Sequence, residues 1–237
     1  MKKILITRKL ILSSEKRASE LFDVKLNKED KLLTKEELIK ESNDCDGILS
    51  SLTEKIDSDV ISKLSSKVKI ISNFAVGFGN IDIIAARKKN IIVTNTPDVL
   101  TAATAEIAIL ILLGAARRAK EGIDWVKKAN WKWSADFLMG KQLTGARLGI
   151  LGMGRIGRAV ADKARSFGMI IHYHNRSQLD KNLEKGAIYH NSLESLLSVS
   201  DFFSIKAFEE SFKRVLTSAF SSFRFSKCFL SFSISIS

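Results

Sequence analysis

Hydrophobic positions along the first two hundred residues change repeatedly between short apolar runs and amphipathic stretches. Short apolar runs bounded by polar or glycine residues are typical of buried parallel strands. The runs occupy 3–7, 46–50, 68–72, 90–94, 148–151, 169–174 and 202–205. Helical patterns lie between them, at 13–22, 60–64, 81–88 and 102–118. This alternation predicts an α/β fold with parallel sheets.

Local signals divide the chain into two units. Thr34 followed by Glu37 forms a capping box, which predicts the start of a further helix. The first unit closes near Pro97, the single proline of the chain. The stretch 102–118 then predicts a long helix, whose wide apolar surface favours a position between two layers of structure. A second α/β unit opens at Arg147.

Composition and charge narrow the class of protein. The chain has 237 residues, 45% of them hydrophobic and 27% charged, so it can bury a core. Its net charge is +12, but the lysines are scattered, so we expect an anionic small ligand and no nucleic acid. Cys45 and Cys228 lack the spacing of a disulfide scaffold or a zinc site, and no metal is expected. Neither a signal-peptide core nor a membrane-spanning stretch is found, which predicts a cytoplasmic protein with no membrane partner.

The last part of the chain differs in composition from the rest. No glycine or proline follows Gly186, and residues 206–237 hold nine serines and seven of the fourteen phenylalanines. Residues 230–237 alternate apolar side chains with serine, a pattern typical of exposed strand edges that aggregate. We therefore expect a tail that lowers solubility, produced by a frameshift or a truncation after Ile205. A genuine alternative terminus stays open.

A glycine-rich turn is the most informative motif. Gly152, Gly154 and Gly157 form G-x-G-x-x-G directly after an apolar strand and directly before a helical pattern. In such a turn the first glycine permits the tight bend, the second lets the backbone approach a pyrophosphate, and the third lets helix and strand pack closely. The helix amino terminus then offers N–H groups to the phosphates. The motif in this context predicts dinucleotide binding.

The strand 169–174 bears on the choice of nicotinamide cofactor. NAD-binding sites place an acidic residue about 20 residues after the turn, where it accepts a hydrogen bond from the ribose 2′-hydroxyl. This chain has Asn175, Arg176 and Ser177 there instead. Asn175 can bond a ribose, and Arg176 suits a 2′-phosphate, although an ordinary exposed arginine would give the same sequence. The pattern favours NADP(H) over NAD(H), with NAD(H) as the alternative.

Several motifs in a fixed order resemble one enzyme family. They are NFAVGFGNID at 73–82, VTNTP at 93–97, TAE at 104–106, GMGRIG at 152–157 and HNRS at 174–177. Together the chain resembles the D-isomer-specific 2-hydroxyacid dehydrogenases, and most of all their glyoxylate/hydroxypyruvate reductase branch. The resemblance runs from residue 3 to Ile205.

The resemblance implies a fold, a reaction and a set of site residues. The fold is a flavodoxin-like substrate domain at 1–99 and an incomplete Rossmann domain at 100–205, followed by a tail at 206–237 that does not match the family. The reaction is hydride transfer from NADPH to glyoxylate or hydroxypyruvate, and the intact protein is implied to be a homodimer. Val76 and Gly77 would bind the substrate carboxylate through their N–H groups. The residues implied to bind the cofactor are Thr104, Gly152, Gly154, Arg155, Ile156, Gly157, Asn175, Arg176 and Ser177.

Catalytic side chains are not assigned. In the family an arginine within Asn-x-x-Arg-Gly clamps the oxo acid, and a glutamate-supported histidine protonates the alkoxide. Residues 206–237 contain no such motif and no histidine, so we expect little or no turnover by this chain. The positions of His172, His174 and His190 favour structural or surface roles over catalysis. A non-catalytic dinucleotide-binding or interaction protein therefore remains the alternative.

Overall fold

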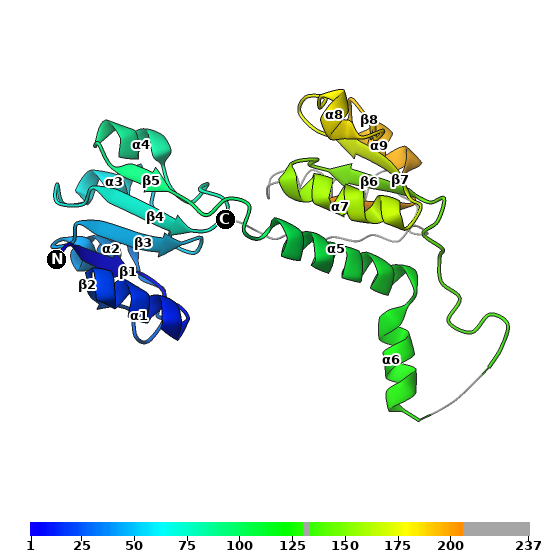
Figure 1. Ribbon diagram of the computed structural model, residues 1–237, viewed down its shortest axis with the longest axis horizontal. Helices are drawn as coiled ribbons and strands as arrows, with labels where there is room; N and C mark the ends of the chain where they lie inside the picture. Colours follow the sequence, from blue (N-terminus) through cyan, green and yellow to red (C-terminus); the bar gives the residue numbers. More distant parts are fainter. Residues whose placement is uncertain (130–132, 206–237) are drawn as a thin grey trace. The chain divides into compact units, whose positions relative to one another are not determined.

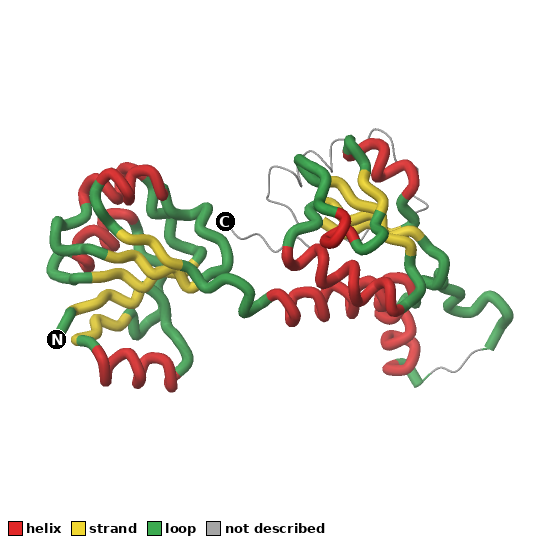
Figure 2. Tube along the Cα trace, turned by 45° about the horizontal axis from the view of Figure 1, so that its top comes forward, coloured by secondary structure: helices red, strands yellow, loops and turns green. Residues whose placement is uncertain are grey.

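The computed structural model describes residues 1–129 and 133–205, which form two compact units (Figure 1 and Figure 2). The N-terminal unit contains residues 1–99, and the C-terminal unit begins at Leu100. Each unit has its own parallel sheet and its own buried core.

The described residues of the N-terminal unit form a five-stranded sheet in the order β2-β1-β3-β4-β5. This is the flavodoxin-like order. Its strands are β1 (Lys3–Ile6), β2 (Asp23–Leu26), β3 (Gly47–Ser51), β4 (Ile70–Phe74) and β5 (Ile92–Thr94). Its helices are α1 (Leu12–Leu21), α2 (Lys35–Ser42), α3 (Ser58–Lys63) and α4 (Ile83–Lys88). The strand β2 was not anticipated, because its four residues carry no clear apolar run.

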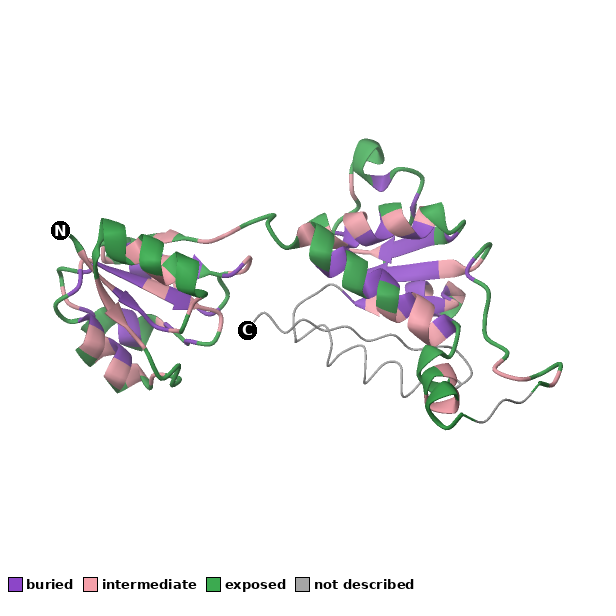
Figure 3. Ribbon diagram, turned by 60° about the horizontal axis from the view of Figure 1, so that its bottom comes forward, coloured by how far each residue is buried: buried purple, intermediate pink, exposed green. Residues whose placement is uncertain are grey.

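Short polar side chains fix where the helices of this unit begin. Thr34 accepts a hydrogen bond from the Glu37 N–H, and Glu37 reaches back to the Thr34 N–H, so the predicted capping box is confirmed. Asp57 and Asp82 cap α3 and α4 by accepting from the N–H groups of Val60 and Ala85, without a reciprocal bond. The helices pack apolar side chains such as Leu38 onto the central strands, whose buried residues are purple in Figure 3.

The described residues of the C-terminal unit form a four-stranded sheet in the order β8-β7-β6-β9, which matches the first four positions of the Rossmann order 3-2-1-4-5-6. The strands are β6 (Arg147–Leu151), β7 (Ile170–His174), β8 (Ile188–Tyr189) and β9 (Phe202–Ile205). The helices are α5 (Thr101–Ala116), α6 (Ala119–Lys127), α7 (Arg155–Ser166), α8 (Lys181–Glu184) and α9 (Leu193–Val199). The strand–helix–strand predicted around the glycine turn is confirmed.

The long apolar helix predicted at 102–118 differs from the structure in two respects. It ends at Ala116, and a new helix starts after Arg118, whose φ of 53° is left-handed and interrupts the helical hydrogen bonding. The prediction that it lies between two layers is also wrong for the described part of this unit. One side packs on α7, whereas Ile107 and Leu110 on the other side are 43% and 64% exposed.

Candidate functional site

The glycine turn between β6 and α7 is shaped by two tight contacts. Gly152 has a φ of 93°, which glycine adopts without strain, and its N–H donates to the His174 carbonyl at 3.0 Å. A Cβ atom on Gly157 would overlap the carbonyl oxygen of Gly152. The turn therefore requires glycine at both positions to bring α7 this close to β6.

Packing within the chain does not require glycine at position 154. A Cβ atom built on this residue would meet no other atom within 4 Å among the described residues, so the space above it is open. Gly154 is also the N-cap of α7, and no side chain in the described part of the chain caps this helix. The amino terminus of a helix carries a partial positive charge and N–H groups without intrahelical acceptors. An anion can approach this backbone closely.

Asn175 holds the turn from the neighbouring strand. Its side-chain oxygen accepts a hydrogen bond from the Met153 N–H at 2.7 Å, and Met153 is itself fully buried. This contact was missed in the sequence because the two residues lie on different strand ends. The predicted ribose contact of Asn175 stays a prediction.

The other cofactor residues lie around this turn or on α5. Arg155 and Ile156 form the first turn of α7, and Arg176 and Ser177 follow β7 as exposed residues. Thr104 lies in the first turns of α5 and is only 9% exposed. The structure thus groups the residues of the turn with Asn175, and the cofactor roles of all of them stay predictions.

Val76 and Gly77 lie in the N-terminal unit, in the loop 75–79 that joins β4 to the segment before α4. Among the residues that the structure describes, no acceptor is found for the N–H groups of Val76 and Gly77. Adjacent N–H groups without a protein acceptor can bind an anion where the backbone makes them converge. Their binding of a substrate carboxylate stays a prediction.

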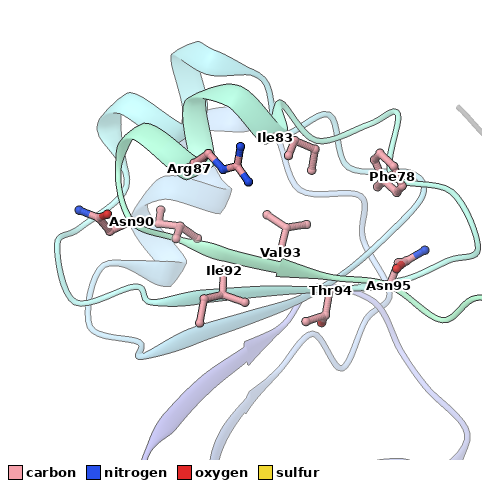
Figure 4. Close-up of a pocket in the computed structure, with 9 residues that line it drawn as sticks. Phe78, Ile83, Arg87, Asn90, Ile92, Val93, Thr94 and Asn95 are labelled. Atoms are coloured by element: carbon pink, nitrogen blue, oxygen red, sulfur yellow. The ribbon is translucent and has the colours of Figure 1, made fainter.

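A groove of about 510 Å³ runs beside this loop, between α4 and the outer edge of β5 (Figure 4). Figure 4 shows Ile83, Arg87 and Val93 on one side of β5, and Ile92 and Thr94 on the other. The walls are mainly apolar, with the Arg87 guanidinium as a cationic group. The groove lies outside the residues predicted to bind substrate.

The three histidines gather in the C-terminal unit in a directed chain of hydrogen bonds. The Ser195 hydroxyl donates to the Ser192 carbonyl at 3.0 Å, so its oxygen must accept from His190 Nδ1, 3.2 Å away. The other nitrogen of His190, Nε2, is then free to accept from His172 Nδ1 at 2.8 Å. His174 Nδ1 donates to the His190 carbonyl at 2.8 Å. This arrangement supports structural roles for all three.

Burial is the main cause of altered titration in this cluster. It lowers the pKa of His172, which is 7% exposed, and the neighbouring His190 and Arg147 lower it further. Burial also lowers the pKa of His190, with a smaller effect from His174. Both imidazoles are therefore neutral at pH 7, as the hydrogen-bond directions require.

No group of three or more His, Cys, Asp or Glu side chains in residues 1–129 and 133–205 is arranged to hold a metal ion. In the same residues, no helix combines the length and the apolar character needed to cross a membrane.

Comparison with known proteins identifies relatives over most of the chain. The family model of the D-isomer specific 2-hydroxyacid dehydrogenase catalytic domain matches residues 4–225. A glycerate dehydrogenase of Hyphomicrobium methylovorum is 41% identical over 209 residues, which are 87% of this chain and 65% of that protein. A glyoxylate reductase of Thermococcus kodakarensis is 40% identical over 206 residues, or 84% of this chain and 61% of that protein. The chain thus spans under two thirds of the length of these relatives.

Solved structures agree with the sequence relatives. A glyoxylate reductase from Paecilomyes thermophila matches 87% of this chain and 65% of its own, with a TM-score of 0.74 and 34% identity. A D-lactate dehydrogenase from Aquifex aeolicus, complexed with NAD and lactic acid, matches 87% of this chain and 60% of its own, with a TM-score of 0.73 and 26% identity. The predicted fold class, α/β with a Rossmann-type unit, is confirmed. The chain belongs to the D-isomer-specific 2-hydroxyacid dehydrogenase family.

Proposed function

We propose that this chain binds a nicotinamide dinucleotide at the turn Gly152–Gly157 and a small 2-oxo acid at Val76 and Gly77. In the intact protein the reaction is reduction of glyoxylate or hydroxypyruvate to the D-2-hydroxy acid by NADPH. The relatives named glyoxylate reductase and glycerate dehydrogenase support this substrate class. The cofactor supplies the hydride, and the residues of this chain bind and orient it.

The observation that carries the proposal is the contrast between Gly154 and Gly157. Gly157 is packed against the backbone of the turn, whereas the space above Gly154 is open and faces the amino terminus of α7. A purely structural turn would need the first kind of glycine alone. An open glycine at a helix amino terminus suits the close approach of a pyrophosphate.

The test of dinucleotide binding is Gly154→Ala, with Gly114→Ala as its matched control. The added methyl group of Gly154→Ala lies in open space, so the fold is retained and NADPH binding, followed by fluorescence titration, weakens at least tenfold. Gly114 lies in α5, where a methyl group would make an ordinary contact with Ala119 at 3.8 Å. The control should bind NADPH as the parent does. Equal binding by Gly154→Ala would overturn the proposal.

The preference for NADP(H) rests on Arg176. Its side chain is exposed directly after β7, and no partner is found for it among the described residues, so the guanidinium is available to a 2′-phosphate. NADPH should therefore bind more tightly than NADH, and Arg176→Ala should remove most of the difference. Arg17→Ala, an exposed arginine of α1 paired with Glu20, is the control. Equal affinities of the parent chain for the two cofactors would contradict the preference.

The expectations for turnover and assembly come from the family resemblance, and the expected location comes from the lack of a signal-peptide core or membrane-spanning stretch in the sequence. We expect little turnover by the 237-residue chain, because the arginine and histidine that the family uses have no counterpart in residues 206–237. We expect the intact protein to be a cytoplasmic homodimer, and the exposed Ile107 and Leu110 of α5 support a subunit contact there. NADPH oxidation with glyoxylate and size-exclusion chromatography test these points. Robust turnover by the 237-residue chain would contradict the expected lack of catalytic groups and would exclude the non-catalytic alternative.

A further inference from the structure

Three successive carbonyl groups of the loop 75–79 are held by hydrogen bonds from the strand ends beside it. The Ala75 carbonyl accepts from the Thr96 N–H at 2.9 Å. The Val76 carbonyl accepts from Asn95 Nδ2 at 2.7 Å, and the Gly77 carbonyl accepts from Asn73 Nδ2 at 3.0 Å. Two of the three donors are side-chain amides, from residues that the sequence analysis gave no role.

Peptide geometry converts these contacts into the direction of N–H groups. In a planar trans peptide the C=O of one residue and the N–H of the next point in opposite directions. Fixing the Ala75 carbonyl therefore directs the Val76 N–H away from Thr96. Fixing the Val76 carbonyl likewise directs the Gly77 N–H away from Asn95. A carbonyl that accepts a hydrogen bond also makes the N–H of its own peptide a stronger donor.

The amide of Asn73 is itself held rigidly. Its oxygen accepts from the Ser50 hydroxyl at 3.1 Å, and its nitrogen also donates to Asn80 Oδ1 at 3.0 Å. Asn80 in turn donates to the carbonyls of Ser51 and Glu54 at 2.9 and 3.0 Å. Asn73 and Asn80 are 1% and 8% exposed, so this network is buried and its amide orientations are determined.

We propose that Asn95 is a positioning residue, which aims the Gly77 N–H at the carboxylate of a small 2-oxo acid, with Asn73 fixing the following peptide. The inference rests on the proposed substrate site and adds the groups that orient it. Asn95 makes no contact with substrate in this account. It acts only through the Val76–Gly77 peptide, which it holds by a single hydrogen bond at 2.7 Å.

The experiment uses two variants of Asn95 and a matched control. Asn95→Asp has nearly the same shape but offers a carboxylate to the Val76 carbonyl in place of a donor, and Asn95→Ala removes the donor without adding charge. Asn27→Ala removes another side-chain amide that donates to backbone carbonyls, those of Thr7 and Lys31, outside the loop. Oxamate is the probe, and binding is followed through the amide resonances of Val76 and Gly77 in the full chain.

The proposal predicts changes in both the free and the bound chain. Residual dipolar couplings of free Asn95→Asp and Asn95→Ala should show a reoriented Gly77 N–H, whereas Asn27→Ala matches the parent. Both Asn95 variants should bind oxamate at least about tenfold more weakly, the cost of one hydrogen bond to a charged group. Unfolding midpoints check that each variant is folded.

The outcomes separate a failure of the positioning role of Asn95 from a failure of the proposed substrate site. If the parent binds oxamate and both Asn95 variants keep its affinity and its Gly77 N–H orientation, the positioning role is overturned. If the parent shows no shift at Val76 or Gly77 with oxamate, the substrate site fails. The couplings of the free chain then still decide whether Asn95 orients this peptide.

Discussion

The turn at Gly152–Gly157 and the loop 75–79 both follow a parallel strand, and we propose that both offer backbone N–H groups to an anion. In the turn the backbone is accessible because glycine has no side chain. A Cβ on Gly157 would collide with Gly152, and one on Gly154 would fill the open space. The loop achieves it by adding side chains, the amides of Asn73 and Asn95 that hold its carbonyls. The same exposure of backbone thus has two unrelated sequence signatures.

The difference is one of sequence distance. The glycines of the turn lie within six consecutive residues, so the motif can be read from one segment. The amide that holds the Val76 carbonyl comes from Asn95, 19 residues later and at the end of another strand. Such a pair becomes visible only when the pairing of β4 with β5 is known.

We expect the greatest loss of stability from a substitution in the turn Gly152–Gly157. Gly157→Ala places a methyl group against the Gly152 carbonyl, and backbone on both sides resists a shift. We expect the C-terminal unit to lose about 3 kcal/mol or more of unfolding free energy, measured by urea denaturation, as for an overpacked core position. Gly114→Ala should change the unfolding free energy by less than about 1 kcal/mol. A Gly157→Ala chain as stable as the parent would contradict the account of the turn.

A smaller loss of stability is expected when one of the side-chain amides that hold the loop 75–79 is removed. Asn73→Ala leaves the Ser50 hydroxyl, the Asn80 carboxamide and the Gly77 carbonyl without their partner in a buried place. Leaving buried polar groups unsatisfied costs about 1–3 kcal/mol for each group, less what water recovers. Hydrogen exchange should show faster opening of the N-terminal unit, and unchanged exchange in β4 would exclude this role.

Lowering the pH should destabilise the C-terminal unit more than the N-terminal unit, by a smaller amount than the two substitutions above. His172 and His190 have pKa values below the ordinary 6.5, so below that pH the unfolded chain binds more protons than the folded one. Stability of the C-terminal unit is therefore complete above pH 6.5 and is lost as pH falls through the lowered pKa values. The slope is at most about 1.4 kcal/mol per pH unit for each proton. Arg147, Asp201 and His174 are the other charged or titratable groups that face this pair.

The N-terminal unit serves as the control for this loss of stability in acid. The N-terminal unit contains no histidine, so hydrogen exchange in β4 should respond less than in β6 between pH 7.5 and 5.5. His190→Gln should reduce the response in β6. A response of equal size in both strands would locate the acid sensitivity elsewhere.

The same substitution, asparagine to aspartate, should have different consequences at positions 175 and 95, and its effect on stability at position 175 should be small. Asn175 uses its oxygen to accept from the Met153 N–H, whereas Asn95 uses its nitrogen to donate. Asn175→Asp keeps the acceptor, and stability should change by less than about 0.5 kcal/mol. The new carboxylate would accept from a ribose 2′-hydroxyl and repel a 2′-phosphate, so the preference should move toward NADH. Titration with both cofactors measures this, and an unchanged preference would contradict it.

Much of the fold could be predicted from local sequence patterns. The alternation of apolar runs and helical stretches gives the two parallel sheets, and Thr34 with Glu37 marks a helix start correctly. These features depend on residues within a few positions of each other. The end of α5 was missed because Arg118 adopts a left-handed conformation, and no glycine or proline beside it indicates a break in the helix.

The site was predictable to different degrees in the two units. The order and context of Gly152, Gly154 and Gly157 identify the turn before any coordinates. The roles of Asn73 and Asn95, and the contact between His172 and His190, depend on side chains brought together by strand pairing. No spacing rule along the chain marks such contacts, because each partner lies on a separate strand or loop.

The two proposed anion sites should also differ in their sensitivity to heat. Asparagine is among the thermolabile residues, since its amide is lost with time and heat and becomes a carboxylate. At Asn175 that conversion keeps the oxygen that holds Met153, but at Asn95 it removes the donor that holds the Val76 carbonyl. Prolonged heating should therefore alter the loop 75–79 while the turn Gly152–Gly157 keeps its shape. If both sites act as proposed, a heated preparation should lose oxo-acid binding before it loses dinucleotide binding.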